Sequence, residues 1–259
     1  MTMFTPVARS IADLSTLVRR NMLRYVRRPD VFAILVIHPL IILLLLRYVL
    51  GGELLIPDYI QYFMPGLFAL AVVTGSATIG IELAEDVSSG VVDSLRVLPI
   101  TRSAFLAARA ITDVAKNVLI IPLVGVLGVA VGFHLVGSPS RIILAAVLLL
   151  ALGWMFAWIS MTIALWTRSV DATQGLALML AVVFSFVSSG FAPVYTMPSW
   201  LQPFVKVNPV THVASAVRAL MTTAHGPVAH NILSSLISIT VVLVIMIPLA
   251  VTRYARDLR

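Results

Sequence analysis

IILAAVLLLALGWMFAWISMTIALW, residues Ile142–Trp166, is the stretch of sequence that decides the fold. It contains no charged residue. A helix that rises 1.5 Å per residue needs about 20 apolar residues to cross the roughly 30 Å hydrocarbon core of a bilayer. We therefore predict that this stretch forms a transmembrane helix.

Further stretches of similar length and apolarity lie on both sides of it. They run over Val31–Leu50, Tyr59–Leu83, Val114–Phe133, Gln174–Val194 and Ile232–Thr252. Together with the first stretch they predict an all-α integral membrane protein with six transmembrane helices. The transmembrane domain is expected to occupy residues 31–252.

The composition excludes several other classes of protein. Hydrophobic residues make up 60% of the chain, against roughly 45–50% in soluble domains, and the mean hydropathy is +1.03. There is no cysteine, and the five histidines form no metal-binding spacing, so we expect no disulfide, no metal site and no catalytic residue. The net charge of +7 lies mostly beside apolar runs, which favours a role in topology over nucleic-acid binding.

The distribution of basic residues predicts the orientation in the membrane. If six helices cross, the chain ends share one side, and this side holds all but four of the 18 lysines and arginines. Cytoplasmic loops are the ones that carry excess lysine and arginine. Both termini are therefore predicted to lie in the cytoplasm of a bacterial cell, with the protein in the inner membrane and residues 253–259 as a basic tail. The four exceptions are Arg47, Arg141, Lys206 and Arg218.

Residues 1–30 are predicted to form an amphipathic helix at the membrane surface. Ile11, Leu14 and Val18 fall on one helical face, while Arg20 and Arg24 fall nearly opposite. One interpretation is that the helix only lies on anionic lipid. The other is that it also contacts a cytoplasmic partner.

The connection over residues 84–101 is unusual because it is acidic on a side that is otherwise basic. This favours a docking surface for a partner. The alternative is a solvated loop with local ion pairs such as Arg109–Asp113, which are four residues apart on the next predicted helix. In a helical arrangement bent at Gly90, one face gathers Glu82, Glu85, Ser89, Asp93 and Arg96, and the opposite face gathers Val87, Val91, Leu95 and Leu98.

A helix start follows this connection. Pro99 ends the preceding segment, and Thr101 is a suitable cap for the next helix. That helix is expected to carry Arg109, Asp113 and Lys116 into the third transmembrane stretch.

The segment before the last transmembrane stretch, residues 195–231, is rich in proline and too short to cross. Asn208 followed by Pro209 is a strong helix-start signal. Trp200 suits a membrane–water interface. We predict short re-entrant helices here, with His212 and Arg218 either lining a pathway or held as interfacial side chains.

The sequence contains no motif that would supply energy for transport. A phosphate-binding G-x-x-x-x-G-K-[ST] loop is absent, so the chain is not expected to hydrolyse ATP by itself. No acid falls at the middle of a predicted transmembrane stretch. Glu82 and Asp113 lie at the cytoplasmic edges, and Glu53 and Asp58 lie at the outer edges.

In their order and spacing, four features taken together resemble the type-2 ABC exporter permeases. That family includes daunorubicin-resistance-like drug exporters and polysaccharide and lipid export permeases. The features are the basic N-terminal helix, Tyr62-x-x-Pro65-Gly66, Glu85-Asp86 through Gly90 to Leu98-Pro99, and Phe191-x-Pro193 through Pro198-x-Trp200-Leu201 and Asn208-Pro209 to Arg218.

The resemblance implies half of an exporter for hydrophobic or amphipathic cargo of the drug, lipid or polysaccharide class. Two permease subunits, identical or related, would pair in the lipid membrane and dock on two separately encoded ATPase subunits. ATP and magnesium would bind those partners, and this chain would hold no cofactor. By the same resemblance, the ATPase contacts map to Arg20, Arg24, Glu82, Glu85, Asp86, Gly90, Asp93, Leu95 and Arg96, and the outer gate of the pathway maps to Phe191, Pro193, Trp200, Asn208 and Arg218.

Two other hypotheses stay open at the level of the sequence. A secondary transporter or channel would act without an ATPase partner. A membrane scaffold or assembly factor would fit the topology but leave the short outer helices without a role.

Overall fold

The computed structural model describes residues 29–50, 58–89, 102–222 and 227–257. The predicted surface helix over residues 1–30 and the connection over residues 90–101 therefore lie almost entirely outside the described residues. Every regular element within the described ranges is helical. The elements are α2 (Pro29–Leu44), a π-helical turn η1 (Leu45–Leu50), α3 (Tyr59–Ser88), α5 (Arg102–Ala130), α6 (Pro139–Thr167), α7 (Val170–Phe186), a 3₁₀ turn η2 (Val194–Thr196), α8 (Gln202–Val207), α9 (Pro209–Met221) and α10 (Val228–Asp257).

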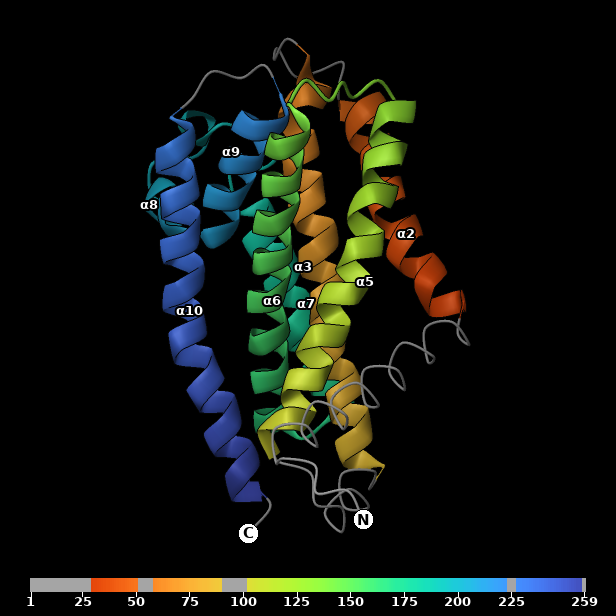
Figure 1. Ribbon diagram of the computed structural model, residues 1–259, viewed down its shortest axis with the longest axis vertical. Helices are drawn as coiled ribbons and strands as arrows, with labels where there is room; N and C mark the ends of the chain where they lie inside the picture. The colour runs from red at the N-terminus through yellow and green to blue at the C-terminus, as the bar shows by residue number, and fades with distance from the viewer. Residues whose placement is uncertain (1–28, 51–57, 90–101, 223–226, 258–259) are drawn as a thin grey trace, which may run out of the picture.

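The long helices run side by side along the longest axis of the molecule (Figure 1). Helix α3 lies at the centre, where it packs against α2, α5, α6, α7 and α9. Helix α10 forms one edge of the bundle and packs against α6 and α9, and α2 lies at the opposite edge (Figure 1). The short helices α8 and α9 lie towards the end of the bundle opposite the C-terminus (Figure 1).

The all-helical membrane fold class agrees with the prediction. Four helices of the described residues are long and apolar enough to cross a membrane: α3, α6, and the larger parts of α5 and α10. The apolar helices at Ile37–Val49 and Val170–Phe186 are shorter. The count of six crossings, the orientation and the re-entrant position of α8 and α9 therefore stay predictions.

The end of the fifth predicted stretch was wrong. Helix α7 ends at Phe186 rather than continuing to Val194. The carboxyl end of a helix leaves carbonyl groups without intrahelical partners. Here the side-chain amide of Asn208 donates to two of them, on Phe184 (2.7 Å) and Val187 (2.6 Å), so the chain turns away.

Helix α3 is longer than predicted, and α5 agrees with the expected continuous helix into the third stretch. The chain stays helical to Ser88, so the first residues of the predicted 84–101 connection belong to α3. Helix α5 begins at Arg102, directly after Thr101, and continues without interruption to Ala130. The segment carrying Arg109 and Asp113 is thus one continuous helix with the third stretch, as predicted.

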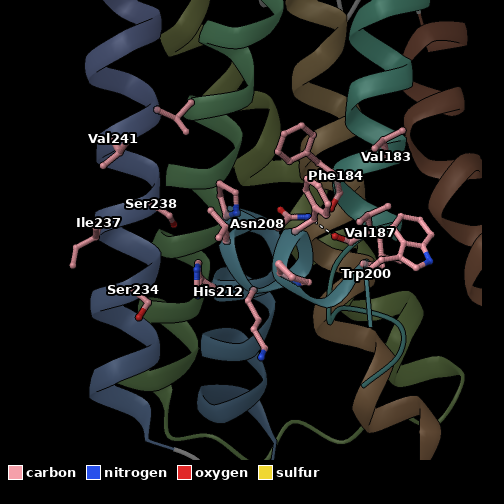
Figure 2. A pocket seen from close by; sticks show the side chains of 17 residues that line it. Val183, Phe184, Val187, Trp200, Asn208, His212, Ser234, Ile237, Ser238 and Val241 are labelled. Atoms are coloured by element: carbon pink, nitrogen blue, oxygen red, sulfur yellow. Dashed lines mark hydrogen bonds between the residues drawn. The ribbon is translucent and has the colours of Figure 1, made fainter. Parts of the chain in front are cut away.

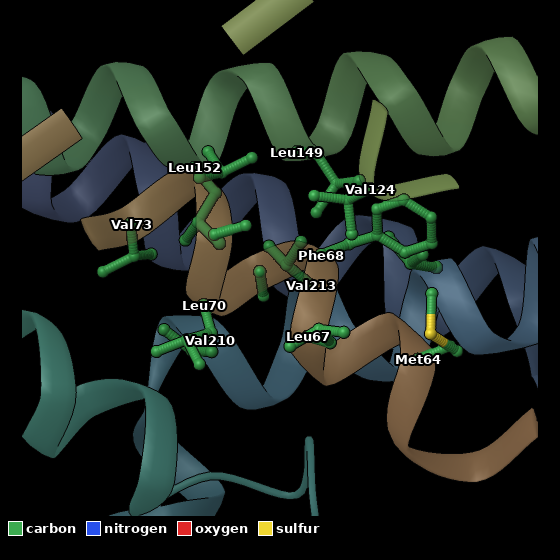
Figure 3. Close-up of a cluster of buried hydrophobic side chains, with 14 of the residues drawn as sticks. Met64, Leu67, Phe68, Leu70, Val73, Val124, Leu149, Leu152, Val210 and Val213 are labelled. Atoms are coloured by element: carbon green, nitrogen blue, oxygen red, sulfur yellow. The ribbon is translucent and has the colours of Figure 1, made fainter. Parts of the chain in front are cut away.

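The core forms around α3, whose side chains are buried on nearly every face. In a membrane, small residues allow helices to approach closely and gain van der Waals contact. Gly80 is an example, because a Cβ atom added there would lie 2.3 Å from the backbone oxygen of Ser160 on α6. Figure 3 shows side chains of four helices meeting in this core: Met64, Leu67, Phe68, Leu70 and Val73 of α3, Val124 of α5, Leu149 and Leu152 of α6, and Val210 and Val213 of α9.

Candidate functional site

The ends of α3 and α5 nearest the predicted cytoplasmic side are joined by a buried ion pair. Arg109 of α5 donates a hydrogen bond to Asp86 of α3, and its guanidinium also lies 3.7 Å from the carboxylate of Glu82. The side chains of Arg109 and Asp86 are 2% and 3% exposed. The guanidinium carbon is 5.2 Å from the ring centre of Phe105. These contacts hold the two helix ends together on either side of the 90–101 connection.

The local pair between Arg109 and Asp113, part of the alternative interpretation of the connection, is not formed. The face of α5 that carries Arg109 packs against α3, so Arg109 reaches the acids of that helix instead. Asp113 pairs with Lys116, with 2.8 Å between the carboxylate oxygen and the ammonium nitrogen. Both side chains are buried, so this part of α5 is not a solvated surface.

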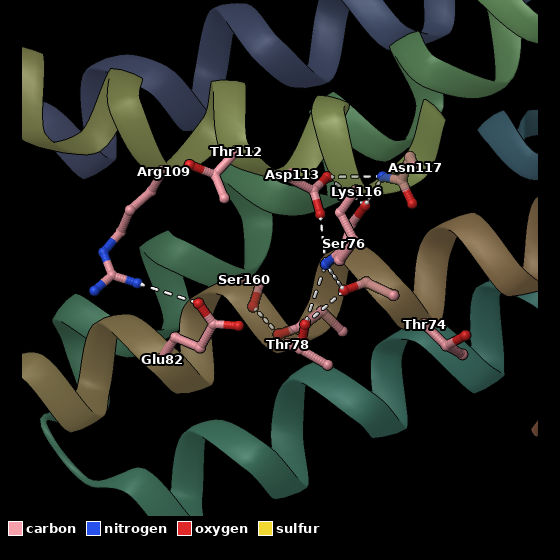
Figure 4. A network of polar contacts seen from close by, with 12 residues as sticks. Thr74, Ser76, Thr78, Glu82, Arg109, Thr112, Asp113, Lys116, Asn117 and Ser160 are labelled. Carbon is pink, nitrogen blue, oxygen red and sulfur yellow. Dashed lines mark hydrogen bonds and ion pairs between the residues drawn. The ribbon is translucent and has the colours of Figure 1, made fainter. Parts of the chain in front are cut away.

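Asp113 belongs to a polar network between α3 and α5 (Figure 4). Ser76 donates to its Oδ2 atom at 2.6 Å, and the amide of Asn117 donates to the same atom at 3.0 Å. Lys116 donates to the backbone oxygen of Gly75 at 2.5 Å and to Thr78 at 3.2 Å. The charges of the acid and the base thus compensate each other inside the bundle.

The network gives Asp113 a buried position inside the bundle, while its depth in the membrane stays a prediction. Asp113 is 0% exposed and lies well inside α5, which begins at Arg102. Helix α6 closes the network, because a Cβ atom on Gly153 would lie 2.8 Å from the amide nitrogen of Asn117. Polar residues within transmembrane helices are costly and usually serve a function.

A second cluster lies at the opposite end of α3 and is centred on Arg218 of α9. Its guanidinium donates to the backbone oxygens of Tyr62 (3.0 Å), Ser189 (2.9 Å) and Gly190 (3.2 Å). The guanidinium carbon lies 3.9 Å from the ring centre of Tyr62. We call Tyr59, Tyr62, Ser189, Gly190 and Arg218 the Arg218 cluster.

Two tyrosine hydroxyls add hydrogen bonds between α3 and the turn after α7. Tyr59 donates to the backbone oxygen of Phe191 at 3.1 Å, and Tyr62 donates to that of Ser189 at 3.2 Å. The first turns of α3 and the turn that follows α7 are therefore joined by both side chains. Buried backbone oxygens beyond the end of a helix have no intrahelical donor, so they need hydrogen bonds from side chains such as these tyrosines.

Two glycines allow the same segments to touch. A Cβ atom on Gly66 would lie 2.5 Å from the backbone of Gly190, and one on Gly190 would lie 2.9 Å from Gly66. No side chain fits in this space, so both positions need glycine for close approach of the backbones. The Tyr62-x-x-Pro65-Gly66 motif thus meets the turn after α7.

The structure brings together three of the five predicted outer-gate residues. Phe191 is buried and stacks on Phe186 with 5.0 Å between ring centres, next to the Arg218 cluster. Asn208 caps α9, accepting the backbone N–H of Val210 at 2.9 Å, as predicted from its position before proline.

The other two outer-gate residues lie apart from this cluster. Pro193 precedes η2 and is half-buried. Trp200 is 70% exposed, at the edge of a groove between α7, α8 and α10. The exposed indole agrees with an interfacial anchor rather than a wall of a closed pathway.

Burial affects the pKa values of the two ionisable residues of α9, His212 and Arg218. Burial lowers the pKa of His212, and nearby His230 lowers it further, which favours the neutral imidazole at pH 7. Burial also lowers the pKa of Arg218. The guanidinium still stays protonated, because arginine does not lose its proton in proteins.

Of the predicted ATPase contacts, the structure describes Glu82, Glu85 and Asp86. Only Glu85 is exposed, while Glu82 and Asp86 face Arg109. Residues Arg20, Arg24, Gly90, Asp93, Leu95 and Arg96 lie outside the described residues.

Sequence reasoning missed the polar network at the middle of α3 and the tyrosine contacts at its start. Asp113 and Lys116 were visible as an acid and a base three residues apart beside an apolar run, which is the pattern of a buried pair. The hydroxyls of Tyr59 and Tyr62 gave no comparable signal, because nothing in the local sequence shows that α3 begins beside the turn after α7.

Comparison of the sequence with known proteins identifies the family of this chain. The profile of the ABC-2 type transporter family matches residues 12–222. The daunorubicin resistance ABC transporter permease protein DrrB1 of Streptomyces coeruleorubidus is 31% identical over 223 residues, covering 85% of this chain and 78% of its own length.

Two further relatives extend the comparison. The probable doxorubicin resistance ABC transporter permease protein DrrC of Mycobacterium tuberculosis is 29% identical over 83% of this chain and 79% of its own length. The putative transport permease ycf38 of Cyanophora paradoxa is 28% identical over 81% of this chain and 74% of its own length. The family match covers most of the residues that form the bundle, and the chain therefore belongs to the ABC-2 type transporter family of membrane permeases.

Proposed function

We propose that this chain is the permease subunit of an ATP-driven exporter of hydrophobic or amphipathic molecules. In this proposal two permease subunits pair, and two separate ATPase subunits bind their cytoplasmic ends. The observation that carries the proposal is α3, a single helix that contacts the predicted ATPase-facing region at one end and the Arg218 cluster at the other.

The length of α3 makes it suitable for transmitting force. Its 30 residues span about 45 Å at 1.5 Å per residue, which is more than the hydrocarbon core. Asp86 lies near its carboxyl end, and Tyr59 and Tyr62 lie in its first turn. A movement applied at one end therefore reaches the other through a continuous hydrogen-bonded helix.

At the cytoplasmic end, the Arg109–Asp86 pair joins both helices that flank the 90–101 connection. We expect the ATPase to press on this connection and on the exposed Glu85. Because α3 and α5 are joined there, they would move as one body. This motion follows ATP binding only if ATP favours one arrangement of the two permease subunits over the other.

At the outer end, the same motion would act on the Arg218 cluster. Five hydrogen bonds from Arg218, Tyr59 and Tyr62 join α3, α9 and the turn after α7. Movement of α3 would either carry this turn along or break these bonds. Both responses change the outer opening of a pathway that lies between two permease subunits.

The comparisons support export of drug-like molecules by this chain. Two of the relatives are named for daunorubicin or doxorubicin resistance, and both are named ABC transporter permeases. We propose that the cargo here has the same general chemistry, a large apolar surface with a polar part.

The orientation in the proposal has both termini in the cytoplasm of a bacterial inner membrane. The end of α3, the start of α5 and the end of α10 lie together at the end of the bundle that holds the C-terminus (Figure 1). Arg168 and Arg253 also lie at this end, between α6 and α7 and in the last turns of α10. Basic residues at this end support a cytoplasmic location.

Reconstitution into liposomes tests the proposal. The chain, together with the ATPase encoded nearest to it, is expected to transport daunorubicin only when ATP is present. The chain alone is expected to show neither ATP hydrolysis nor transport. Transport by the chain alone, driven by a proton or sodium gradient, would instead support a secondary transporter.

A further inference from the structure

A wide apolar groove opens on the side of the bundle between α7, α8 and α10 (Figure 2). Its volume is about 1150 Å³, and the first residues of α9 form its floor. This exceeds the roughly 300–1,000 Å³ of pockets that hold drug-sized molecules. Val183, Phe184 and Val187 of α7 form one wall, and Ile237 and Val241 of α10 form the other.

Asn208 and Trp200 line the groove beside the end of α7, where the amide of Asn208 bonds backbone oxygens of Phe184 and Val187, and the other polar groups gather near the start of α10. Ser234 and Ser238 lie in the first half of α10, and His212 faces them from α9 (Figure 2). Further along α10 the lining becomes purely apolar at Val241 and Val242. From Ser234 to Val242 the helix rises about 12 Å. The polar end lies towards the start of α10, and the apolar end lies towards the middle of the bundle.

Lys206 adds a positive charge to this groove. It is exposed at the end of α8. Within the described ranges, no acid forms an ion pair with Lys206. The neighbour that lowers the pKa of His212, which shares the groove, is His230 rather than an acid. The polar end of the groove is thus suited to an anion.

The groove opens sideways onto the apolar surface of the bundle. Phe204 is 68% exposed at its edge, and Ile237 and Val241 are each 55% exposed. Such a surface faces lipid in a membrane protein, so an occupant enters from the bilayer. The apolar wall of the groove does not distinguish one lipid tail from another, because all lipid tails are about as apolar as leucine. The charge at Lys206 therefore decides which lipid is preferred.

We propose that this groove binds an anionic phospholipid of the surrounding bilayer. Its phosphate lies at Lys206, within reach of Ser234, and one acyl chain follows α10 towards Val242. This lipid is separate from any exported cargo, and its binding does not depend on the ATPase.

Native mass spectrometry of the purified full chain tests the proposal, with dioleoyl phosphatidylglycerol and dioleoyl phosphatidylcholine as probes. The wild-type chain is expected to bind phosphatidylglycerol more tightly. Lys206→Gln is expected to lower that affinity about five-fold, which corresponds to about 1 kcal/mol per cation near the membrane surface, and to leave phosphatidylcholine unchanged. Arg141→Gln is the control, because Arg141 is also exposed near the start of a helix at the same end but lies outside the groove.

A second variant tests the groove rather than the charge. Ser238→Phe fills the middle of the groove and is expected to reduce retention of both lipids, with unchanged thermal unfolding as the check on folding. Equal affinities of the wild-type chain for the two lipids would overturn the proposal. So would equal losses from Lys206→Gln and Arg141→Gln, which would indicate a general surface potential.

Coverage of the groove by a second permease subunit is the competing outcome. The chain has no cysteine, so Phe204→Cys introduces a single thiol at the edge of the groove. Under oxidation in native membranes we expect no disulfide between two copies. A rapid, complete crosslink would show that another copy occupies the groove and would overturn the lipid proposal.

Discussion

Replacing Arg109 by methionine offers the sharpest test of the buried pair that joins α3 and α5. The change keeps a long side chain but removes the charge, leaving the buried carboxylate of Asp86 without its guanidinium partner. Removing one partner of a buried ion pair costs about 3–5 kcal/mol, because the remaining charge stays out of water. Arg109→Met is therefore expected to lower the free energy of unfolding by about that amount.

Thermal unfolding in detergent, followed by the fluorescence of the four tryptophans, measures the effect. For chains of 150–250 residues each kcal/mol shifts Tm by about 2–4 °C, so the expected fall is on the order of 10 °C. Glu85→Gln is the matched control, since this acid lies on the same helix but is exposed. Its effect is expected to stay within about 0.5 kcal/mol.

The double variant Arg109→Met with Asp86→Leu separates the loss of charge pairing from the loss of packing. Two apolar side chains of similar volume often replace a buried pair without loss of stability. Tm is therefore expected to return most of the way to the wild-type value, since the remaining acid, Glu82, is partly exposed. The reasoning is refuted if Arg109→Met behaves like Glu85→Gln, or if the double variant is less stable than the single one.

The other predictions concern the interior and the outer end. Gly66→Ala is expected to lower both Tm and transport, because overpacking costs about 1–3 kcal/mol. Its control is Gly175→Ala, since Gly175 has open space around it; in the same thermal unfolding assay this variant should be neutral or stabilising. Lys116→Met is expected to cost about 3–5 kcal/mol in thermal unfolding, and adding Asp113→Asn should recover much of this; no recovery would argue against their pairing. Arg218→Lys keeps the charge but not the fork that reaches three carbonyl oxygens, so ATP-driven transport should fall while binding to the ATPase, measured by co-purification, stays normal.

Much of the fold follows from local sequence. The apolar stretch at Ile142–Trp166 became α6 (Pro139–Thr167), and Asn208-Pro209 marked the start of α9. Arg109 and Asp113 were correctly expected on a helix that continues into the third apolar stretch, which became α5 (Arg102–Ala130). These features depend on residues close together in the chain, where apolar length and capping decide the outcome.

The candidate site was only partly predictable. The resemblance to exporters indicated Phe191, Asn208 and Arg218, and the structure places these three near the turn after α7. It did not indicate that Arg218 stacks on Tyr62, because that contact joins residues 156 positions apart. The end of α7 was misplaced for the same reason, since the side chain that ends it comes from Asn208.

The sequence by itself determined that this chain is built from apolar helices, because the bilayer requires long apolar runs and satisfied backbones. It also determined membership of the ABC-2 type transporter family. Only the tertiary structure decided the partners of its charges. Arg109 could pair with Asp113 on its own helix or with Asp86 on another, and the rotation of α5 against α3 selected Asp86. Helix rotation is set by packing over the whole interface, with close contacts such as those at Gly66 and Gly80, and no short stretch of sequence contains that information.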